Sequence, residues 1–362
     1  MYILGIESSC DETAAAVIDE QGNLLSDVVH SQIEIHAPYG GIVPEVASRD
    51  HMRRIVSVVR EAVTRSGLDW DKLGGIAVTN RPGLNGALLV GSQFAKGLAW
   101  ARHLPLVTVD HLVGHLLAVF VRRSAGPVRW TAPDGSQGDE ISFPLVALLA
   151  SGGHTAIYRL DGPNDAQIRE LGATRDDAAG EAFDKIAKLL GLGYPGGPVI
   201  DRLAARGDAT RFTLPSPMAR KDSLEFSFSG IKSYVARHVA LHGKPQDEQA
   251  VSDLCAAFQN AVVASLVNKT VRAARREGVA GIVLTGGVAA NRRLREVAAH
   301  ACKRANLRLA VPPMASCTDN AAMIAYAGAL RLARGERDSL DFGVATRTHL
   351  ERVTRKGSGK RG

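Results

Sequence analysis

The feature that most constrains the fold of this chain is its alternation of short apolar runs, glycine turns and helical periodicity. In the first third, strands are expected at 2–7, 14–19, 24–30, 75–79 and 106–109. Helical spacing of apolar residues occurs at 49–66, 86–103 and 111–121. The turn pair Gly22-Asn23 predicts a hairpin. Together these patterns predict an α/β layer in which helices cover a sheet.

The second part of the chain repeats this organisation at low resolution. Strands are expected at 145–150, 155–160, 281–285 and 307–311, and helices at 176–190, 289–305 and 319–333. A length of 362 residues suits two domains. We therefore expect lobes at 1–121 and 142–340, with a linker or surface insertion at 122–141, a helical insertion at about 162–277 and a basic tail at 341–362.

The charge of the chain is concentrated at its end. The formal net charge is +7, and most of it comes from Arg352, Arg355, Lys356, Lys360 and Arg361. Such a tail is either solvated or adds affinity for phosphates. With 45% hydrophobic and 22% charged residues, the composition excludes a disordered chain.

The four cysteines form no CxxC pair, which excludes a zinc ribbon and a thioredoxin motif and fits a reducing cytoplasm. The first residues contain no basic segment and include an acid at Glu7, a pattern that is not typical of a signal peptide. The longest apolar stretch, 104–121, contains Asp110, His111 and His115, which argues against a membrane span. We expect a cytoplasmic protein without membrane attachment.

The segment His111-Leu-Val-Gly-His115 is a candidate metal site. Residues four apart project from one face of a helix, so both imidazoles can reach one ion, and imidazole suits iron, zinc, nickel or copper. The alternative is a pair of buried histidines satisfied by hydrogen bonds. A zinc protease helix would place a glutamate general base where this chain has Leu112.

Two glycine-rich turns are candidate ligand loops. In 149–155, a Ser-Gly-Gly turn between two strands offers backbone N–H groups to an anion, or is a simple hairpin turn. In 282–291, a strand runs into Gly286 and Gly287 before a helix that begins near Asn291. This arrangement lets a nucleotide approach a helix N-terminus, although ordinary strand-to-helix connections use the same residues.

Five acids are candidates for chemistry, and each also has a purely structural interpretation. Asp11 and Glu12 follow the first strand and can hold a metal-phosphate or act on an amine, or belong to an acidic surface loop. Asp184 and Asp201 can bind ribose hydroxyls, or are surface charges of helices. Asp319 stands where the N-cap of a helix would stand, which by itself explains its presence.

Taken in order, these motifs closely resemble the universal tRNA N6-adenosine threonylcarbamoyltransferase family, formerly described as O-sialoglycoprotein endopeptidases. The motifs are GIESSCDET, HLVGH, LLASGGHT, DDAAGEAFDK, YPGGP, TGGVAANRRLR and SCTDNAAMI. The resemblance extends from about residue 2 to about residue 335. It implies the two-lobed fold of the actin, hexokinase and Hsp70 ATPases, with a helical insertion in the second lobe.

The resemblance also implies roles for particular residues. The metal ligands of the family match His111, His115 and Asp319. Its substrate-binding loop matches Leu149, Ala150, Ser151, Gly152 and Gly153. Its nucleotide contacts match Asp184, Gly197, Asp201 and Asn291. The acids of its first loop match Asp11 and Glu12, and we expect one of them to take the proton from the acceptor amine.

The implied reaction is that of a metal-dependent acyltransferase. A threonylcarbamoyl group moves from threonylcarbamoyl-AMP to N6 of the adenosine 3′ of the anticodon, in tRNAs that read codons beginning with A. One divalent metal is implied; iron, Fe(2+), is the usual assignment, and zinc, Zn(2+), suits the same ligands. The implied protein partners are a shorter paralogous subunit (TsaB-like) and a small P-loop ATPase (TsaE-like).

Several readings remain open from the sequence. An ATPase or small-molecule kinase of the same fold would share the glycine loops, and a zinc endopeptidase or a non-catalytic scaffold are further alternatives. The candidates for a tRNA-binding surface are Arg49, Arg53, Arg54, Arg292, Arg293 and Arg295. An apolar face of the helix at 49–66 is a candidate for pairing with the paralogue.

Overall fold

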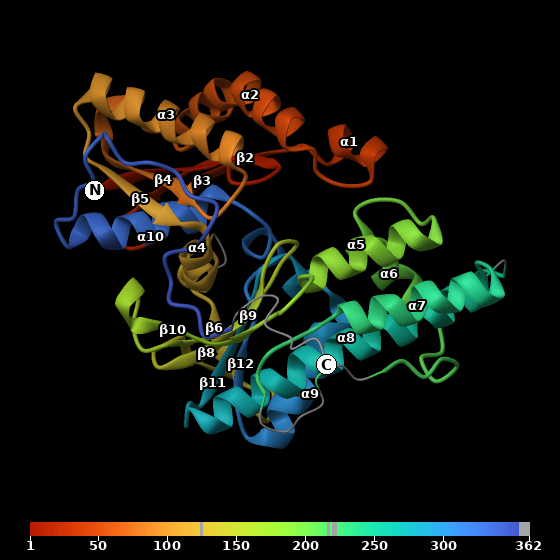
Figure 1. Ribbon diagram of the computed structural model, residues 1–362. Coiled ribbons are helices and arrows are strands. Elements are labelled where there is room, and N and C mark those ends of the chain that lie inside the picture. Colours follow the sequence, from red (N-terminus) through yellow and green to blue (C-terminus); the bar gives the residue numbers. More distant parts are fainter. Residues whose placement is uncertain (124–125, 216–217, 219–222, 246, 355–362) are drawn as a thin grey trace. The chain divides into compact units, whose positions relative to one another are not determined.

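The computed structural model describes residues 1–123, 126–215, 218, 223–245 and 247–354. The chain forms two compact units, each a sheet with helices packed on it (Figure 1). The first unit comprises Met1–Val128 and Pro312–His349, and the second comprises Arg129–Val311 and Leu350–Gly362. The predicted α/β class is confirmed. The last four cations of the predicted basic tail lie outside the described residues.

The sheet of the first unit has the strand order β3-β2-β1-β4-β5. Its strands are β1 (Tyr2–Glu7), β2 (Glu12–Asp19), β3 (Leu24–Ser31), β4 (Leu73–Arg81) and β5 (Leu106–Asp110). The first three strands form antiparallel hairpins, whereas β4 and β5 run parallel to β1. Because parallel strands end at the same edge of a sheet, the polar residues that end β1, β4 and β5 come together there.

Helices cover both faces of this sheet. On one face, α2 (Pro44–Arg65) and α3 (Asn85–Arg102) share a core with Ala15 and Val17 of β2. On the other face, α10 (Ala321–Ala333) packs against Ala14 and Ala16. Successive residues of a strand point to opposite faces, so the continuous apolar run of β2 serves both cores.

Helix α10 belongs to the first unit, whereas we expected its residues in a lobe extending from 142 to 340. The physical reason is its packing on β1, β2 and β4. A Cβ atom at Gly5 would lie 2.4 Å from the carbonyl oxygen of Ala321, so only glycine in β1 allows this close approach.

The sheet of the second unit has the strand order β10-β9-β8-β11-β12-β6-β7. Its strands are β6 (Arg129–Thr131), β7 (Gln137–Glu140), β8 (Leu145–Ala150), β9 (Thr155–Leu160), β10 (Ile168–Ala173), β11 (Gly281–Thr285) and β12 (Arg308–Ala310). The central strands β8, β11 and β12 are parallel, and the outer pairs are antiparallel. The carboxyl ends of β8 and β11 therefore place both glycine-rich turns at one edge of the sheet.

The segment 122–141 was expected to be a linker or surface insertion, but it contains β6 and β7, which extend the second sheet beyond β12. Trp130 of β6 is fully buried. A Cβ atom at Gly281 would lie 2.4 Å from its ring, so the ring packs directly on the backbone of β11. This aromatic anchor gives the short hairpin a place in the core.

The helices of the second unit are α5 (Ala179–Leu190), α6 (Gly196–Ala204), α7 (Ser229–His242), α8 (Glu248–Arg276) and α9 (Arg292–Ala305). The expected helical insertion at 162–277 thus begins with strand β10, and its last helix, α8, packs on β8 and β11. Among the described residues, α8 is the one helix long and apolar enough to cross a membrane. Its most apolar window is 67% buried, as in a core helix.

The remaining elements are short. They are α1 (Ile33–His36), α4 (His111–Leu117) and the 3-10 helices Ala37–Tyr39, Trp70–Lys72, Ala118–Phe120, Asp165–Gln167, Gly287–Ala290 and Met314–Ser316. The helix expected at 111–121 thus ends in a 3-10 turn, and the helix expected to begin at 289 begins at Arg292.

Candidate metal centre and substrate-binding loops

The two histidines of the candidate metal site lie on α4, which begins immediately after β5. Asp110 ends the strand and caps the helix, because its Oδ1 accepts a hydrogen bond from the Leu112 N–H at 2.9 Å. His111 and His115 then project from one helix face, with ring centroids 4.6 Å apart and ring planes at 84°. Both rings are buried. The predicted i, i+4 arrangement is confirmed.

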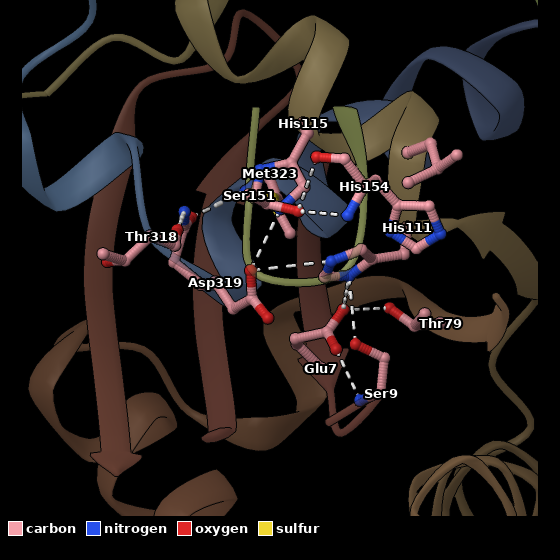
Figure 2. A network of polar contacts seen from close by, with 12 residues as sticks. Glu7, Ser9, Thr79, His111, His115, Ser151, His154, Thr318, Asp319 and Met323 are labelled. Carbon is pink, nitrogen blue, oxygen red and sulfur yellow. Dashed lines mark hydrogen bonds and ion pairs between the residues drawn. The ribbon is translucent and has the colours of Figure 1, made fainter. Parts of the chain in front are cut away.

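Asp319 completes a group of three candidate ligands (Figure 2). Its Oδ1 lies 3.0 Å from His115 Nε2 and 3.5 Å from His111 Nε2. The cap of α10 is Asn320, whose Oδ1 accepts a hydrogen bond from the Met323 N–H at 3.1 Å. The capping role that would have explained Asp319 therefore falls to its neighbour, and the Asp319 carboxylate faces the imidazoles.

A second carboxylate, Glu7, lies on the other side of the His111 ring (Figure 2). Its Oε2 is 3.1 Å from His111 Nδ1 and accepts a hydrogen bond from Thr79 Oγ1 at 2.5 Å. Its Oε1 accepts from the Ser9 N–H at 2.5 Å. Sequence reasoning did not assign Glu7 or Thr79 to the site. The available signal was that each is a polar residue at the end of an apolar strand.

The charges of this group stabilise one another. Burial alone would raise the pKa of Asp319, but the charge of His111 and hydrogen bonds from both histidines hold it well below its usual range. Burial would likewise raise the pKa of Glu7, but the charge of His111 and its hydrogen bond outweigh burial, so the pKa of Glu7 is lowered. Burial lowers the pKa of His115, whereas the charges of Glu7 and Asp319 overcome burial at His111 and raise its pKa well above 6.5.

These donors fit a divalent transition metal. The candidate ligand atoms of His111, His115 and Asp319 all lie within 4.8 Å of one another, and Asp319 faces the Nε2 atoms of both rings. Two imidazole nitrogens and one carboxylate form a donor set that suits iron or zinc and leaves coordination positions for other ligands. In the part of the chain that the structure describes, no other group of three or more such side chains was found.

The two candidate catalytic acids are also in the first unit, in the connection from β1 to β2. Asp11 is buried, and its backbone carbonyl accepts a hydrogen bond from the Gln32 N–H at 3.0 Å. Glu12 begins β2 and accepts from Ser31 Oγ at 3.3 Å. Burial, and then the negative charges of Asp11 and Asp319, raise the pKa of Glu12 well above 4.5. A carboxylate with a raised pKa is a stronger base than an ordinary carboxylate.

His51 of α2, which the sequence analysis did not single out, holds this connection from both sides. Its Nε2 lies 3.0 Å from the carbonyl oxygen of Cys10, and its Nδ1 lies 2.7 Å from Thr13 Oγ1. A carbonyl oxygen only accepts, so Nε2 carries the hydrogen and Nδ1 accepts from the threonine hydroxyl. The residues on each side of Asp11 and Glu12 are thereby tied to α2, Cys10 through its carbonyl and Thr13 through its hydroxyl.

In the second unit, the predicted substrate-binding loop is a tight turn after β8. Leu149 and Ala150 end the strand, and the Ser151 N–H donates to the His154 carbonyl at 2.8 Å. Gly152 and Gly153 are exposed, and a Cβ atom at either would meet no described atom within 4 Å. The two glycines thus leave open space above backbone N–H groups.

The second glycine turn lies beside this loop. Gly286 has φ +87°, and a Cβ atom there would lie 2.5 Å from the Ala150 carbonyl oxygen. Helix α5 begins next to the same turn, because the Gly180 N–H donates to the Ser151 carbonyl at 3.2 Å. Backbone from three segments therefore meets around the Ser-Gly-Gly turn.

The four predicted nucleotide contacts differ in what they do within the second unit. Asp184 Oδ1 accepts from the Gly196 N–H at 2.7 Å and so joins α5 to α6. Asn291 caps α9 by accepting from the Leu294 N–H at 2.9 Å, and its Nδ2 donates to Gln259. Asp201 Oδ1 is buried without a hydrogen-bond partner among the described residues. Gly197, like Gly152, has open space around its Cα.

Comparison with known proteins places this chain in a family. Residues 23–326 match the sequence model described as "TsaD: tRNA N6-adenosine threonylcarbamoyltransferase". A protein of that name from Sorangium cellulosum (strain So ce56) is 69% identical over 363 residues, covering 100% of both chains. Another from Geobacter metallireducens is 47% identical, covering 98% of each.

Solved structures support the fold. HypF from T. kodakarensis superposes with a TM-score of 0.56 at 14% identity, covering 92% of this chain and 48% of that one. Component A of the Acidaminococcus fermentans (R)-2-hydroxyglutaryl-CoA dehydratase gives 0.51 at 14% identity, covering 92% and 99%. These superpositions bear out the expected fold, that of the actin, hexokinase and Hsp70 ATPases. By its sequence, this chain belongs to the TsaD family of tRNA N6-adenosine threonylcarbamoyltransferases.

Proposed function

We propose that this chain transfers a threonylcarbamoyl group from threonylcarbamoyl-AMP to N6 of the adenosine 3′ of the anticodon, in tRNAs that read codons beginning with A. Family membership supports the reaction. The observation that carries the mechanism is the group of His111, His115 and Asp319, in which both histidines are buried and the carboxylate is partly buried. A phosphotransfer enzyme of the same fold has no evident need for two buried histidines aimed at one carboxylate.

The first unit would hold one divalent metal through His111 Nε2, His115 Nε2 and Asp319. When bound, such a metal acts as a Lewis acid that polarises a carbonyl or phosphate oxygen. We propose Fe(2+) as the native ion, with Zn(2+) as a substitute, because imidazole and carboxylate ligands suit both. The protein keeps the ligands in place through Asp110, which caps the helix that carries both histidines.

The acceptor is an exocyclic amine and a weak nucleophile, so it must lose a proton as the new bond to the carbamoyl carbon forms. We propose that Glu12 or Asp11 accepts this proton. The raised pKa of Glu12 supports this role, because a carboxylate with a higher pKa is a stronger base. AMP leaves with the electrons of the broken bond, and no covalent enzyme intermediate is needed.

The second unit offers separate features for binding the donor. In the open turn at Ser151, Gly152 and Gly153, the N–H groups of the two glycines are suited to a phosphate or carboxylate. The buried Asp201 Oδ1 is an acceptor suited to a ribose hydroxyl. Asp184 of α5 accepts from the Gly196 N–H at the start of α6, the helix that carries Gly197 and Asp201. Asn291 is engaged in capping α9, so we propose that it orients this region while contacting nucleotide through its remaining acceptor capacity.

The proposed partners are tRNA, a TsaB-like paralogue and a TsaE-like P-loop ATPase, and the proposed site of action is the cytoplasm. On α2, Met52 and Val56 are 60% and 52% exposed, which supports this face as the surface for the paralogue. Arg53 and Arg49 on the same helix, and Arg292 on α9, support contacts with the tRNA backbone.

The test is a reconstituted transfer assay. The full chain is combined with its candidate partners, threonylcarbamoyl-AMP and unmodified tRNA, and the nucleosides are analysed by mass spectrometry. Threonylcarbamoyladenosine is expected with the natural tRNA and absent when guanosine replaces the acceptor adenosine. Loss of product in both Asp11→Asn and Glu12→Gln would leave the base unassigned, whereas a full single-turnover rate in both would remove these acids from the mechanism. Consumption of ATP without product would favour the ATPase alternative.

A further inference from the structure

We propose that Glu7 is a positioning residue that fixes the tautomer and orientation of His111, so that His111 presents Nε2 to the metal. The inference rests on the metal centre proposed above. It adds to that centre a carboxylate that does not itself contact the ion and acts through the first histidine.

The geometry leaves the Glu7 side chain little freedom. Glu7 is 1% exposed at the end of β1, and each of its oxygens is engaged. Oε1 accepts from the Ser9 N–H at 2.5 Å, and Oε2 accepts from Thr79 Oγ1 at 2.5 Å. Thr79 lies on β4, the strand parallel to β1, so two neighbouring strand ends hold the carboxylate.

This fixed carboxylate determines which nitrogen of His111 carries the hydrogen. An ionised carboxylate only accepts hydrogen bonds, and its Oε2 lies 3.1 Å from His111 Nδ1. A histidine must be neutral to bind a metal, and in that neutral ring the hydrogen therefore sits on Nδ1 and the lone pair on Nε2. That nitrogen faces Asp319, with 3.5 Å between Nε2 and Oδ1. A carboxylate that orients a ligating histidine in this way commonly raises metal affinity.

The cost of burying the group supports a role beyond packing. A buried charge destabilises a fold unless it is paired and hydrogen-bonded, and an apolar side chain would serve the core of β1 as well. The structural alternative is that Glu7 only ties β1 to β4 through Thr79. The two readings differ in what happens to metal binding when the carboxylate is replaced by an amide of the same shape.

The first measurement is the affinity of the full chain for Zn²⁺ alone, by competition with a chromophoric chelator. Glu7→Gln is expected to weaken binding by about 10- to 100-fold, the usual effect of removing such a partner. The matched control is Asp50→Asn. Asp50 is a buried carboxylate of the same unit, and its Oδ2 lies 2.8 Å from His30 Nε2. The same chemical change there is expected to leave Zn²⁺ affinity unchanged.

The second measurement is the ¹⁵N spectrum of the histidine rings in the Zn²⁺-loaded chain, with His111→Ala used to assign the His111 signals. The wild type is expected to show Nδ1 protonated and Nε2 bound to metal. Glu7→Gln is expected to show a mixture of ring states. Unchanged affinity together with an unchanged ring tautomer in Glu7→Gln would overturn the inference.

Thr79→Val keeps the carboxylate but removes one of its hydrogen-bond donors. This variant is the test if circular dichroism shows that Glu7→Gln does not fold. A several-fold loss of Zn²⁺ affinity in Thr79→Val is expected, and an unchanged affinity would assign Glu7 a purely structural role. If the metal results are as expected but the wild type forms no threonylcarbamoyladenosine, the proposed function fails and this inference stands. If product forms while Glu7→Gln binds Zn²⁺ normally, the proposed function stands and this inference fails.

Discussion

Asn320 caps helix α10, and its neighbour Asp319 thereby remains directed at the histidines of α4. The Asn320 Oδ1 atom accepts from the Met323 N–H at 3.1 Å, while Asp319 Oδ1 lies 3.0 Å from His115 Nε2. Either residue type can cap a helix, so the division of labour between them is a property of the fold. It separates a stabilising residue from a metal ligand at adjacent positions.

This separation predicts different effects for two neighbouring substitutions. Asn320→Ala removes a cap and is expected to lower the free energy of unfolding by about 1 kcal/mol while the chain still binds Zn²⁺. Asp319→Asn is expected to abolish tight Zn²⁺ binding without lowering stability comparably. Urea unfolding and chelator competition measure the two quantities. Equal loss of metal affinity in both variants would contradict the assignment.

Two glycines of the second unit should also respond differently to alanine. Gly153→Ala is expected to change the free energy of unfolding by less than about 0.5 kcal/mol, because its Cβ meets open space, but to slow transfer by intruding on the turn. Gly286→Ala is expected to destabilise the fold by more than about 1 kcal/mol, because its φ is +87° and Ala150 is in the way. A Gly153→Ala enzyme with the wild-type transfer rate would argue against the substrate-binding loop.

His51 should affect catalysis without touching the metal ligands. His51→Phe removes both contacts to the backbone and hydroxyl that flank Asp11 and Glu12, and it is expected to lower kcat while Zn²⁺ affinity is retained. His51→Gln can replace one of these hydrogen bonds and is expected to recover part of the rate. Identical rates for the wild type and His51→Phe would show that the connection needs no support from α2.

Lys269 predicts a pH dependence of stability. The residue is 5% exposed, and its ammonium donates to the Glu225 carbonyl and lies 5.3 Å from the centroid of the Phe226 ring. Burial, with a smaller effect of Arg272, lowers its pKa to about 8 from 10.5. Between pH 8 and 10.5 the unfolded chain binds more protons than the folded chain, so the free energy of unfolding rises with pH in this window.

The measurement is urea unfolding of the wild type and Lys269→Met at several pH values. The wild type is expected to gain up to about 3 kcal/mol relative to the variant as pH rises through this window, by the usual conversion of a pKa shift. The control is Lys303→Met on the exposed side of α9, which should give a curve parallel to that of the wild type. Parallel curves for Lys269→Met would contradict the lowered pKa.

Much of the local structure could be predicted from the sequence. The strands 2–7, 145–150, 155–160 and 281–285 are found at the predicted bounds. They are short apolar runs between glycines or polar turns, so the apolar pattern of the sequence matches the burial of these strands in the structure. The i, i+4 histidines are equally local, because helical geometry alone puts them on one face.

Long-range features could not be predicted in the same way. The hairpin of β6 and β7 lies in a polar, glycine- and proline-containing segment, and it belongs to the sheet because Trp130 finds a place on β11. The position of α10 depends on packing against β1, which its own sequence does not show. Glu7, Thr79 and His111 come from three segments, and they meet only because β1, β4 and β5 end at one edge.

The central claim is that transfer depends on the metal centre formed by His111, His115 and Asp319. The most direct test is the single-turnover rate of threonylcarbamoyladenosine formation in the full chain with its partners, for the wild type, His115→Ala and the control Asp50→Asn. We predict that product forms with the wild type and Asp50→Asn, is lost in His115→Ala, and is lost from the wild type on chelation until Fe²⁺ or Zn²⁺ is restored. An undiminished rate in His115→Ala, or in the chelated wild type, would contradict the claim.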